Sequence, residues 1–395
     1  MTKNSLFLTI TAVILLTLAC SSCGQQGAWD LLSNIGIDPA SPEDLPTEEP
    51  VPNVPEVPNA PATGDSPILS DSWHYRMKIT IPQVSTIDNL IDFPLLLKLD
   101  SSLIDYTKIE PDGSDIAFIS SDETPLYHEI DGSWNPSGDS YLWIKIPTVK
   151  INDFTEFWMY YSSASKTGNL NPQEVWGNQY LGVWHLNETG PIWINSAGTE
   201  NAVPSVEAPV TVPAWSGNGI SVEQTHPNQG LSAGPFSAGP LTLSFWLDQG
   251  VNIGGSRLFV LGDLSLYASD ANDLYIEIDR TWFPMTKKYY AANWYGVGPS
   301  WIVLTWAGTP SLSEVKLYLN GSLAASSDEN IGFGWLSSPL SGNLIMANSG
   351  SGQCTPGIWD EVHLSSAVRS EDWINASWRA YNNSLLTYDI PENLP

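Results

Sequence analysis

The patterned part of the chain begins with an alternation of apolar and polar residues at positions 73–81, "WHYRMKITI". Such alternation is typical of a strand that buries one face. Further short strand-like runs lie at positions 93–100, 115–120, 125–131, 140–147 and 156–162. Turn residues such as Pro111-Asp112-Gly113 separate them. Because no long amphipathic helix pattern interrupts these runs, the sequence predicts an antiparallel β-sandwich.

The second half of the chain continues in the same manner. Strand-like runs lie at positions 181–190, 217–223, 239–248, 301–308, 315–326 and 358–364. One of them contains Asn320-Gly321, a dipeptide typical of tight hairpin turns. The last run leads into a helix pattern in which Ser370 can form the N-cap and two acids suit the positive helix end. We therefore expect an all-β protein that ends in a strand and a packed helix, with Arg369 and Arg379 in surface contacts.

The order of these runs resembles two known families. "WHYRMKITI", "DFPLLLKLD", "DGSDIAF", "PLYHEID" and "YLWIKIP" resemble a bacterial domain of unknown function that precedes a jelly-roll domain in secreted and surface proteins. The runs from residue 181 onward resemble the laminin-G-like, concanavalin-A-like jelly roll of bacterial surface proteins. The resemblance implies two antiparallel β-sandwich domains, at residues 71–180 and 181–387, followed by a tail at 388–395. It also implies glycan or protein binding and, in some relatives, a calcium ion at one edge.

The N-terminus carries a targeting pattern. Residues 1–19 contain a lysine, an apolar run and then small residues, the order found in secretory signal peptides. Leu18-Ala19-Cys20 resembles the cleavage box of bacterial lipoproteins, which implies lipidation of Cys20. Cys23 is the alternative anchor, and a plain signal peptide is the other interpretation. Residues 20–70 are rich in proline and acids and predict a disordered, extended linker. We expect a protein held by lipid in a bacterial cell envelope, at the outer membrane or the cell surface.

Composition excludes several classes of protein. The formal net charge is −28 with only 15 basic residues, so a phosphate-binding surface for nucleic acid is not expected. Of the three cysteines, only Cys354 lies beyond the N-terminal segment. The folded part is therefore not a disulfide scaffold, and it lacks the cysteine pairs of a structural zinc site.

Two adjacent carboxylates lie in the last strand-like run, "WDEVHL", at residues 359–364. Strict alternation places Asp360 and Glu361 on opposite faces, so they are not expected to act as a pair on one substrate atom. His363 falls on the face of Glu361, where a cross-strand or solvent contact suffices. With no serine or cysteine placed beside a base, the sequence predicts no catalytic triad.

Asp360 has two interpretations. It can accept hydrogen bonds from backbone groups, as buried carboxylates commonly do. It can also contribute to a cation site, because the resemblance places an aspartate at this closing strand. Glu188 ends the first strand of the jelly roll, next to the last strand, and hard oxygen ligands of this kind suit calcium. Glu188 and Asp360 are thus the candidate metal ligands, with calcium as the candidate cofactor.

A glucanase-like active site is the enzymatic alternative. Such a site needs acids that alternate on one face of a strand, with a nucleophile and an acid flanking the glycosidic bond. The runs "LYIEIDRTWF" and "YHEID" pair Glu277 with Asp279 and Glu129 with Asp131. In both, the next alternating position is a hydroxyl residue and not an acid. Both pairs are therefore interpreted as exposed strand faces, and we expect no catalytic residue.

Aromatic residues gather in the segment "RTWFPMTKKYYAANWYGVG". Exposed aromatics mark recognition surfaces, and they can stack on sugar rings. The candidate ligand-binding residues are Trp282, Tyr290, Trp294 and Tyr295. The sequence thus predicts a non-catalytic surface lipoprotein that recognises an extracellular polysaccharide or a surface protein. A divergent glycan-processing enzyme and a structural spacer of the envelope are the alternatives.

Overall fold

The computed structural model describes most of the chain from residue 73 onward. The described ranges are 73–83, 88–150, 152–163, 168–250, 257–268, 273–278, 285–290, 298–309, 314–327, 339–348 and 354–394. Several residues singled out in the sequence lie outside them: Cys20, Cys23, the linker, Asp279, Thr281, Trp282, Trp294 and Tyr295. Tyr290 belongs to a described strand, but its side chain lies outside the description. Within the described ranges, no helix is both long and apolar enough to cross a membrane.

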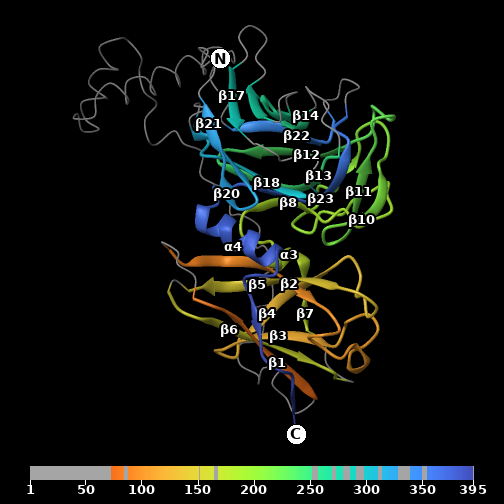
Figure 1. Cartoon of the computed structure of the whole chain (residues 1–395), viewed down its shortest axis with the longest axis vertical. Helices are drawn as coiled ribbons and strands as arrows, with labels where there is room; N and C mark the ends of the chain where they lie inside the picture. The colour runs from red at the N-terminus through yellow and green to blue at the C-terminus, as the bar shows by residue number, and fades with distance from the viewer. Residues whose placement is uncertain are drawn as a thin grey trace, which may run out of the picture. The chain divides into compact units, whose positions relative to one another are not determined.

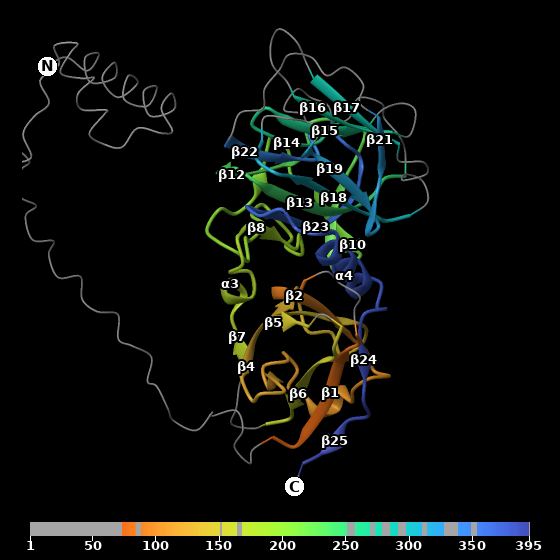
Figure 2. The ribbon, with the colours of Figure 1, turned by 90° about the vertical axis from the view of Figure 1, so that its left-hand side faces the viewer.

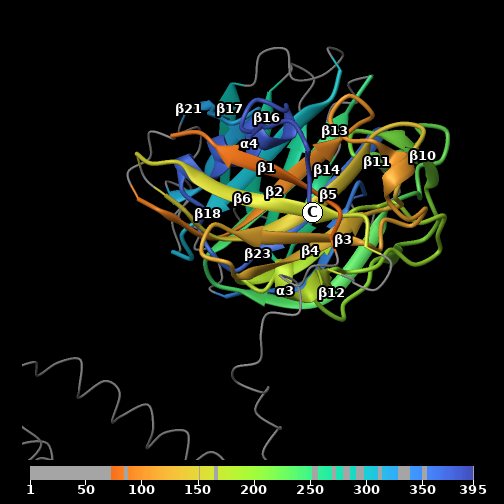
Figure 3. The same ribbon diagram turned by 90° about the horizontal axis from the view of Figure 1, so that it is seen from below.

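The first sandwich is built from one sheet that folds around its own core and is antiparallel except for the short strand β7, which pairs parallel with β4. Its strands are β1 (Tyr75–Ile81), β2 (Leu90–Leu99), β3 (Ile116–Ser120), β4 (Pro125–Asp131), β5 (Ser140–Val149), β6 (Thr155–Tyr161) and β7 (Asn169–Leu170). The order is β2-β5-β4-β3-β6-β1, and β6 is seen between β1 and β3 in Figure 3. Strand β4 joins the two halves, because Leu126 pairs with β3 whereas residues 128–131 pair with β5. Two short helices, η2 (Tyr106–Lys108) and α3 (Pro172–Val175), follow β2 and β7.

The second sandwich consists of two antiparallel sheets. One has the order β10-β11-β23-β13-β18-β19-β20, with β8 also paired to β23. Its strands are β8 (Tyr180–Trp184), β10 (Val210–Ala214), β11 (Gly217–Val222), β13 (Leu241–Asp248), β18 (Ser300–Trp306), β19 (Lys316–Leu319), β20 (Ser322–Leu323) and β23 (Gly357–Ser365). The other has the order β21-β17-β16-β15-β14-β22-β12-β9. Its strands are β9 (Val203–Pro204), β12 (Leu231–Ala238), β14 (Arg257–Leu261), β15 (Leu264–Ala268), β16 (Leu274–Ile278), β17 (Met285–Tyr290), β21 (Ala325–Ser327) and β22 (Leu340–Met346).

These sheets confirm the predicted fold class. The two sheets of the second sandwich are layered in Figure 1 and enclose a core of buried aliphatic and aromatic side chains, as in a jelly roll. The predicted Asn320-Gly321 hairpin joins β19 to β20, and both residues have positive φ, at 48° and 77°. That pair of left-handed residues is the geometry that a two-residue hairpin turn requires.

The expected C-terminal tail is instead part of the first sandwich. Strands β24 (Thr387–Tyr388) and β25 (Glu392–Asn393) both pair antiparallel with β1, as Figure 2 shows. Arg76 on β1 bonds Glu392 at 2.9 Å. The chain therefore leaves the first sandwich after β7, completes the second, and returns to the first sheet.

Helix α4 (Glu371–Tyr381) lies against both sandwiches, and its start agrees with the sequence. Ser370 caps it by accepting a hydrogen bond from the backbone N–H of Trp373. Trp373 packs edge-on against Phe93 of β2 with ring centroids 5.0 Å apart. A single cluster of buried apolar side chains includes residues of β2, β5, α4 and the outer face of β13 and β18. The predicted surface position of Arg369 is wrong, because its guanidinium is buried over the rings of Tyr180 and Trp373.

Candidate functional site

The closing strand β23 departs from strict alternation at Glu361. Its register with β13 shifts between Ser244 and Trp246, and Glu361 has a φ of 51°. A bulge of this kind adds one residue to the strand and turns two successive side chains to the same side. Asp360 and Glu361 therefore share a neighbour, since the Ser216 hydroxyl lies 3.3 Å from Asp360 Oδ2 and 2.8 Å from Glu361 Oε1. The prediction that the two carboxylates point to opposite faces is wrong for this reason.

Glu129 and Asp131 on β4 are buried, so their interpretation as an exposed strand face is wrong as well. The Glu129 carboxylate accepts the indole N–H of Trp176 at 2.6 Å and the hydroxyl of Ser196 at 2.5 Å. Ser196 belongs to the second sandwich, which covers this end of β4. The two acids do share one side of the strand, as their spacing predicted.

Two imidazoles meet the carboxylate of Glu361. Nδ1 of His185 lies 2.9 Å from Oε1 and 3.1 Å from Oε2, and Nε2 of His363 lies 2.7 Å from Oε2. The predicted shared face of Glu361 and His363 is confirmed, but His363 is buried and makes no solvent contact of the expected kind. On its other side, the His185 ring faces Glu129, with Nε2 and Oε2 3.3 Å apart.

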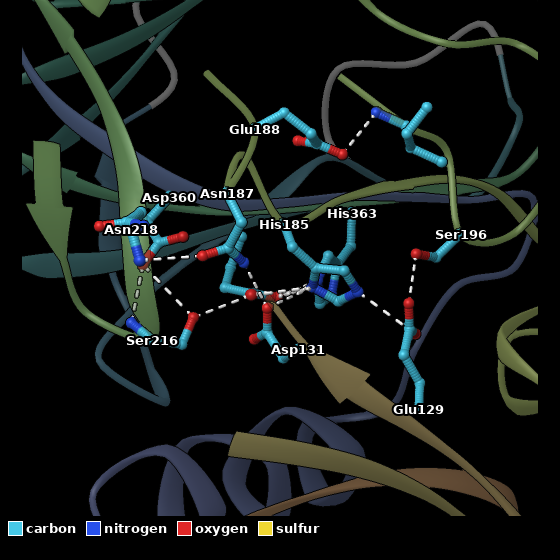
Figure 4. Close-up of polar contacts among 12 residues, drawn as sticks. Glu129, Asp131, His185, Asn187, Glu188, Ser196, Ser216, Asn218, Asp360 and His363 are labelled. Carbon is cyan, nitrogen blue, oxygen red and sulfur yellow. Dashed lines mark hydrogen bonds and ion pairs between the residues drawn. The ribbon is translucent and has the colours of Figure 1, made fainter. Parts of the chain in front are cut away.

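Asn187 and Ser216 extend this network, which Figure 4 shows. Asn187 donates its amide N–H to Asp131 Oδ1 and accepts the backbone N–H of Asn218 at 2.9 Å. The backbone N–H of Ser216 bonds Asp360 Oδ2 at 2.8 Å. Four buried carboxylates, from both sandwiches, are thus joined through hydroxyl, amide and imidazole groups. The four are Glu129, Asp131, Asp360 and Glu361.

Burial and neighbouring charges shift the pKa values of the network in different directions. Burial acts to lower the pKa of His185, but the carboxylates of Glu361, Asp131 and Glu129 outweigh it and raise that pKa well above its usual value. Burial acts to raise the pKa of Glu361, yet His185 and His363 hold it below its usual range. Burial, and then repulsion from Glu361, raise the pKa of Asp131 well above its usual value. The network therefore favours a charged His185–Glu361 pair beside a neutral Asp131 when no other cation is present.

A cleft of about 810 Å³ opens onto this network. Glu129, Asp131 and His185 line its inner wall, where both sandwiches contribute side chains. The rest of the lining is mostly amides, acids and hydroxyls, with no lysine or arginine: Ser133, Asn135, Asp139, Tyr141, Asn171, Gln173, Asn187, Glu188, Asn195, Ser196 and Asn218. Ligand sites are concave and contain convergent polar groups, and this cleft has both features although its lining is more polar than that of a usual small-molecule site.

The candidate metal ligands Glu188 and Asp360 make separate contacts. Glu188 Oε1 accepts the backbone N–H of Ile194 at 2.9 Å, and Asp360 binds the backbone of Ser216. Asp360 thus accepts a hydrogen bond from a backbone group, as the first of its two interpretations predicted. Each also has one buried carboxylate oxygen without a hydrogen-bond partner, and no contact among the described residues joins the two. Calcium at this pair stays a prediction.

Sequence reasoning did not find His185, Asn187, Ser196 or Ser216. His185 and Asn187 follow β8 with the spacing of one strand face, and this was the available signal. Ser196 and Ser216 lie in loops far from β4 and β23 in the sequence, where no periodicity marks them. Of the candidate ligand-binding aromatics, only Tyr290 has a described backbone, in β17 on the other sheet of the second sandwich.

Comparison with family models matches residues 112–197 to a domain of unknown function (DUF2341). This range extends from the first sandwich into the second, and it contains Glu129, Asp131 and His185. Comparison with curated protein sequences gave no match.

Solved structures to which the chain is similar at low identity include the following three. Trypanosoma rangeli sialidase matches at 11% identity and a TM-score of 0.40, over 60% of this chain and 42% of that one. Domain 4 of the extracellular arabinanase AbnA from Geobacillus stearothermophilus, in complex with arabinotriose, matches at 9% and 0.38, over 50% and 97%. The binding domain of Paraclostridial Mosquitocidal Protein 1 matches at 15% and 0.37, over 52% and 53%. The chain spans less than half of the sialidase, and these scores carry no conclusion about function.

Proposed function

We propose that this protein binds a glycan, without cleaving it, in the cleft between its two sandwiches. The observation that carries the proposal is the convergence of carboxylate, amide and hydroxyl groups from both sandwiches on one concave surface. Sugar hydroxyls donate and accept hydrogen bonds, and carboxylates and amides complement both roles. The cleft volume of about 810 Å³ lies within the range of small-molecule sites.

The charge of the cleft favours a neutral sugar. Four carboxylates line it, from Glu129, Asp131, Asp139 and Glu188, and Glu361 lies behind the inner wall against His185. Among the described lining residues, His185 has the one basic side chain, and it is already paired with Glu361. Asp139 is paired with Lys98 at 2.8 Å, but Glu129, Asp131 and Glu188 have no lysine or arginine partner among the described residues. These acids would repel an anionic sugar, whereas a neutral oligosaccharide can bond them through its hydroxyls.

Tyr141 supplies the aromatic surface that sugar rings favour. It lies on β5 beside Asp131, is half-buried, and lines the cleft. An aromatic ring with a polar tip offers both an apolar face and a hydroxyl to a ligand. Tyr127 on neighbouring β4 is exposed but does not line the cleft, so it provides a matched control.

The test is a glycan array probed with the full chain, with and without calcium, and with mass spectrometry for products. We expect saturable binding to neutral oligosaccharides and no new products. Tyr141→Ala should weaken binding at least about tenfold, the loss typical of an aromatic residue at the centre of an interface. Tyr127→Ala should bind as the wild type does. Calcium dependence would support the pair Glu188 and Asp360.

Two outcomes would contradict the proposal. New products would favour the glycan-processing enzyme, with Glu129 and Asp131 as the acids to substitute first. No binding to any glycan would favour a protein ligand or a spacer role. Neither outcome depends on where the chain is anchored.

We also propose that the chain acts in a bacterial envelope, anchored through Cys20. The proposal rests on the order of charged, apolar and small residues before Cys20 and on the proline-rich segment after it. A lipid anchor with an extended spacer would hold the sandwiches away from the membrane surface. Labelled palmitate should be incorporated into the wild type and lost in Cys20→Ser. Loss in Cys23→Ser alone would assign the anchor to Cys23.

A further inference from the structure

The Glu361 carboxylate has the surroundings of a metal ligand. One ligand atom each from His185, Glu361 and His363 lies within 4.8 Å of the other two, and all three residues are buried. Ligand atoms of a tetrahedral zinc ion lie about 3.3–3.5 Å apart at usual bond lengths. The imidazole nitrogens lie 2.7–3.1 Å from the Glu361 oxygens, so small side-chain shifts would place a single ion between the three residues.

Asp131 supplies a fourth group from the first sandwich. Its Oδ1 lies 3.7 Å from Nδ1 of His185, and its Oδ2 is buried without a hydrogen-bond partner. Figure 4 shows this carboxylate beside the imidazoles and Asn187, which holds its other oxygen. An unpartnered carboxylate oxygen in a buried site is costly unless a proton or a cation meets it.

We propose that His185, Glu361, His363 and Asp131 bind one divalent transition-metal ion of the Zn²⁺ type at the inner wall of the cleft. Two carboxylates and two neutral imidazoles around a divalent ion have no net charge, which suits a buried position. Among the described residues, only the two imidazoles form ion pairs with Glu129, Asp131 and Glu361. A resident cation would therefore balance charge that no lysine or arginine balances.

The donor atoms select the kind of ion. Imidazole nitrogen suits zinc and neighbouring transition metals, whereas calcium takes oxygen ligands. The far side of the His185 ring faces Glu129 at 3.3 Å, and ligating histidines are commonly oriented by such a carboxylate. His185 and Asp131 both line the cleft, so an ion can enter from solvent. The ion would share Asp131 and His185 with the cleft wall, but its binding requires no glycan.

The test begins with the full wild-type chain after dialysis against a chelator. Calorimetric titration with Zn²⁺ should give one tight site per chain, and elemental analysis should find one bound ion after desalting. Co²⁺ in place of Zn²⁺ should give the visible absorption of a low-symmetry site with nitrogen ligands. The melting temperature should rise with Zn²⁺ and not with Ca²⁺.

Substitutions locate the ion. Glu361→Gln and Asp131→Asn both retain the shape of the side chain. Glu361→Gln should abolish tight Zn²⁺ binding, and Asp131→Asn should weaken it. Glu129→Gln should weaken it about 10–100-fold, as expected for a group that orients a ligand. His226→Gln is the control, because His226 is exposed beside Glu207 at 2.6 Å and Glu223 at 3.8 Å and could hold zinc at the surface.

The outcomes separate the proposal from its alternatives. Tight binding that survives Glu361→Gln but is lost in His226→Gln would assign zinc to the surface and overturn the proposal. Absence of Zn²⁺ binding to the wild type would also overturn the proposal. The four residues would then form a hydrogen-bonded network held together by protons alone. The Co²⁺ spectrum is measured on the wild type. It therefore tests for nitrogen ligands even if a variant fails to fold. Glycan binding is measured separately, so either proposal can fail alone.

Discussion

The segments that contain strands β4 and β16 have almost the same sequence, but the two strands have different environments. Residues 126–131 are Leu-Tyr-His-Glu-Ile-Asp, and residues 274–279 are Leu-Tyr-Ile-Glu-Ile-Asp. The Glu129 side chain is 8% exposed and lies in the buried network. The Glu277 side chain is 22% exposed and pairs with Arg257 of β14 at 3.2 Å. Since the local sequences nearly match, the difference comes from what each side chain meets, which is the second sandwich for β4 and a strand two places away in the same sheet for β16.

Removing each glutamate should give the largest contrast. Glu129→Ala leaves the Trp176 indole and the Ser196 hydroxyl without their acceptor and removes a carboxylate beside His185. We expect the free energy of unfolding to fall by about 3–5 kcal/mol. Glu277→Ala breaks a partly exposed pair and should cost less than about 1 kcal/mol.

Urea unfolding followed by tryptophan fluorescence measures both changes, with a chelator present to keep metal binding separate. Equal losses in the two variants would show that the interface network stabilises the protein no more than a surface pair does.

The second contrast is the one position at which the two segments differ. His128 is buried against Phe118, and its Nδ1 has no hydrogen-bond partner. Burial lowers the pKa of His128 to about 4. The unfolded chain binds this proton near pH 6.5, so the folded state loses up to about 3 kcal/mol as the pH falls from 7 to 4.

His128→Ile makes the two segments identical and should remove that part of the acid sensitivity. The measurement is the difference between variant and wild-type unfolding free energies at pH 7, 5.5 and 4, which cancels the other titrating groups. A difference that stays constant with pH would mean that His128 is already protonated, or hydrated, in the folded state.

The smallest contrast concerns the serine beside each glutamate. Ser196 donates its hydroxyl to the Glu129 carboxylate at 2.5 Å, whereas Ser265 donates to the backbone carbonyl of Glu277 at 3.4 Å. Ser196→Ala should cost about 1.5–3 kcal/mol, the range for hydrogen bonds to charged groups. Ser265→Ala should cost about 0.5 kcal/mol. Thermal unfolding of both variants checks the order, and a larger loss at Ser265 would contradict it.

Local patterns were sufficient for the fold. The alternation at residues 73–81 became β1, the Asn320-Gly321 turn has the expected backbone, and Ser370 caps α4. Each of these features depends on neighbours within a few residues. Such signals are present in a single sequence, because propensity and hydrogen bonding act locally there.

The site could not be predicted in the same way. The bulge at Glu361 requires a left-handed glutamate, for which the residue type gives no indication, and it reversed the faces of the residues before it. Glu129 and Asp131 are covered by Ser196 and Asn187 of the second sandwich, each more than fifty residues away in the chain. Neither the bulge nor these long-range contacts produce a periodic signal in the sequence. Alternation alone therefore could not distinguish acids that face solvent from acids that face the cleft.

Hydrogen–deuterium exchange with and without the best-binding oligosaccharide from the array tests the location of the site most directly. The account predicts slower exchange in the segments that line the cleft, at residues 129–141 and 185–196, and no change in β16. Protection confined to residues 282–295 would instead place the ligand on the aromatic segment and contradict a binding site between the sandwiches.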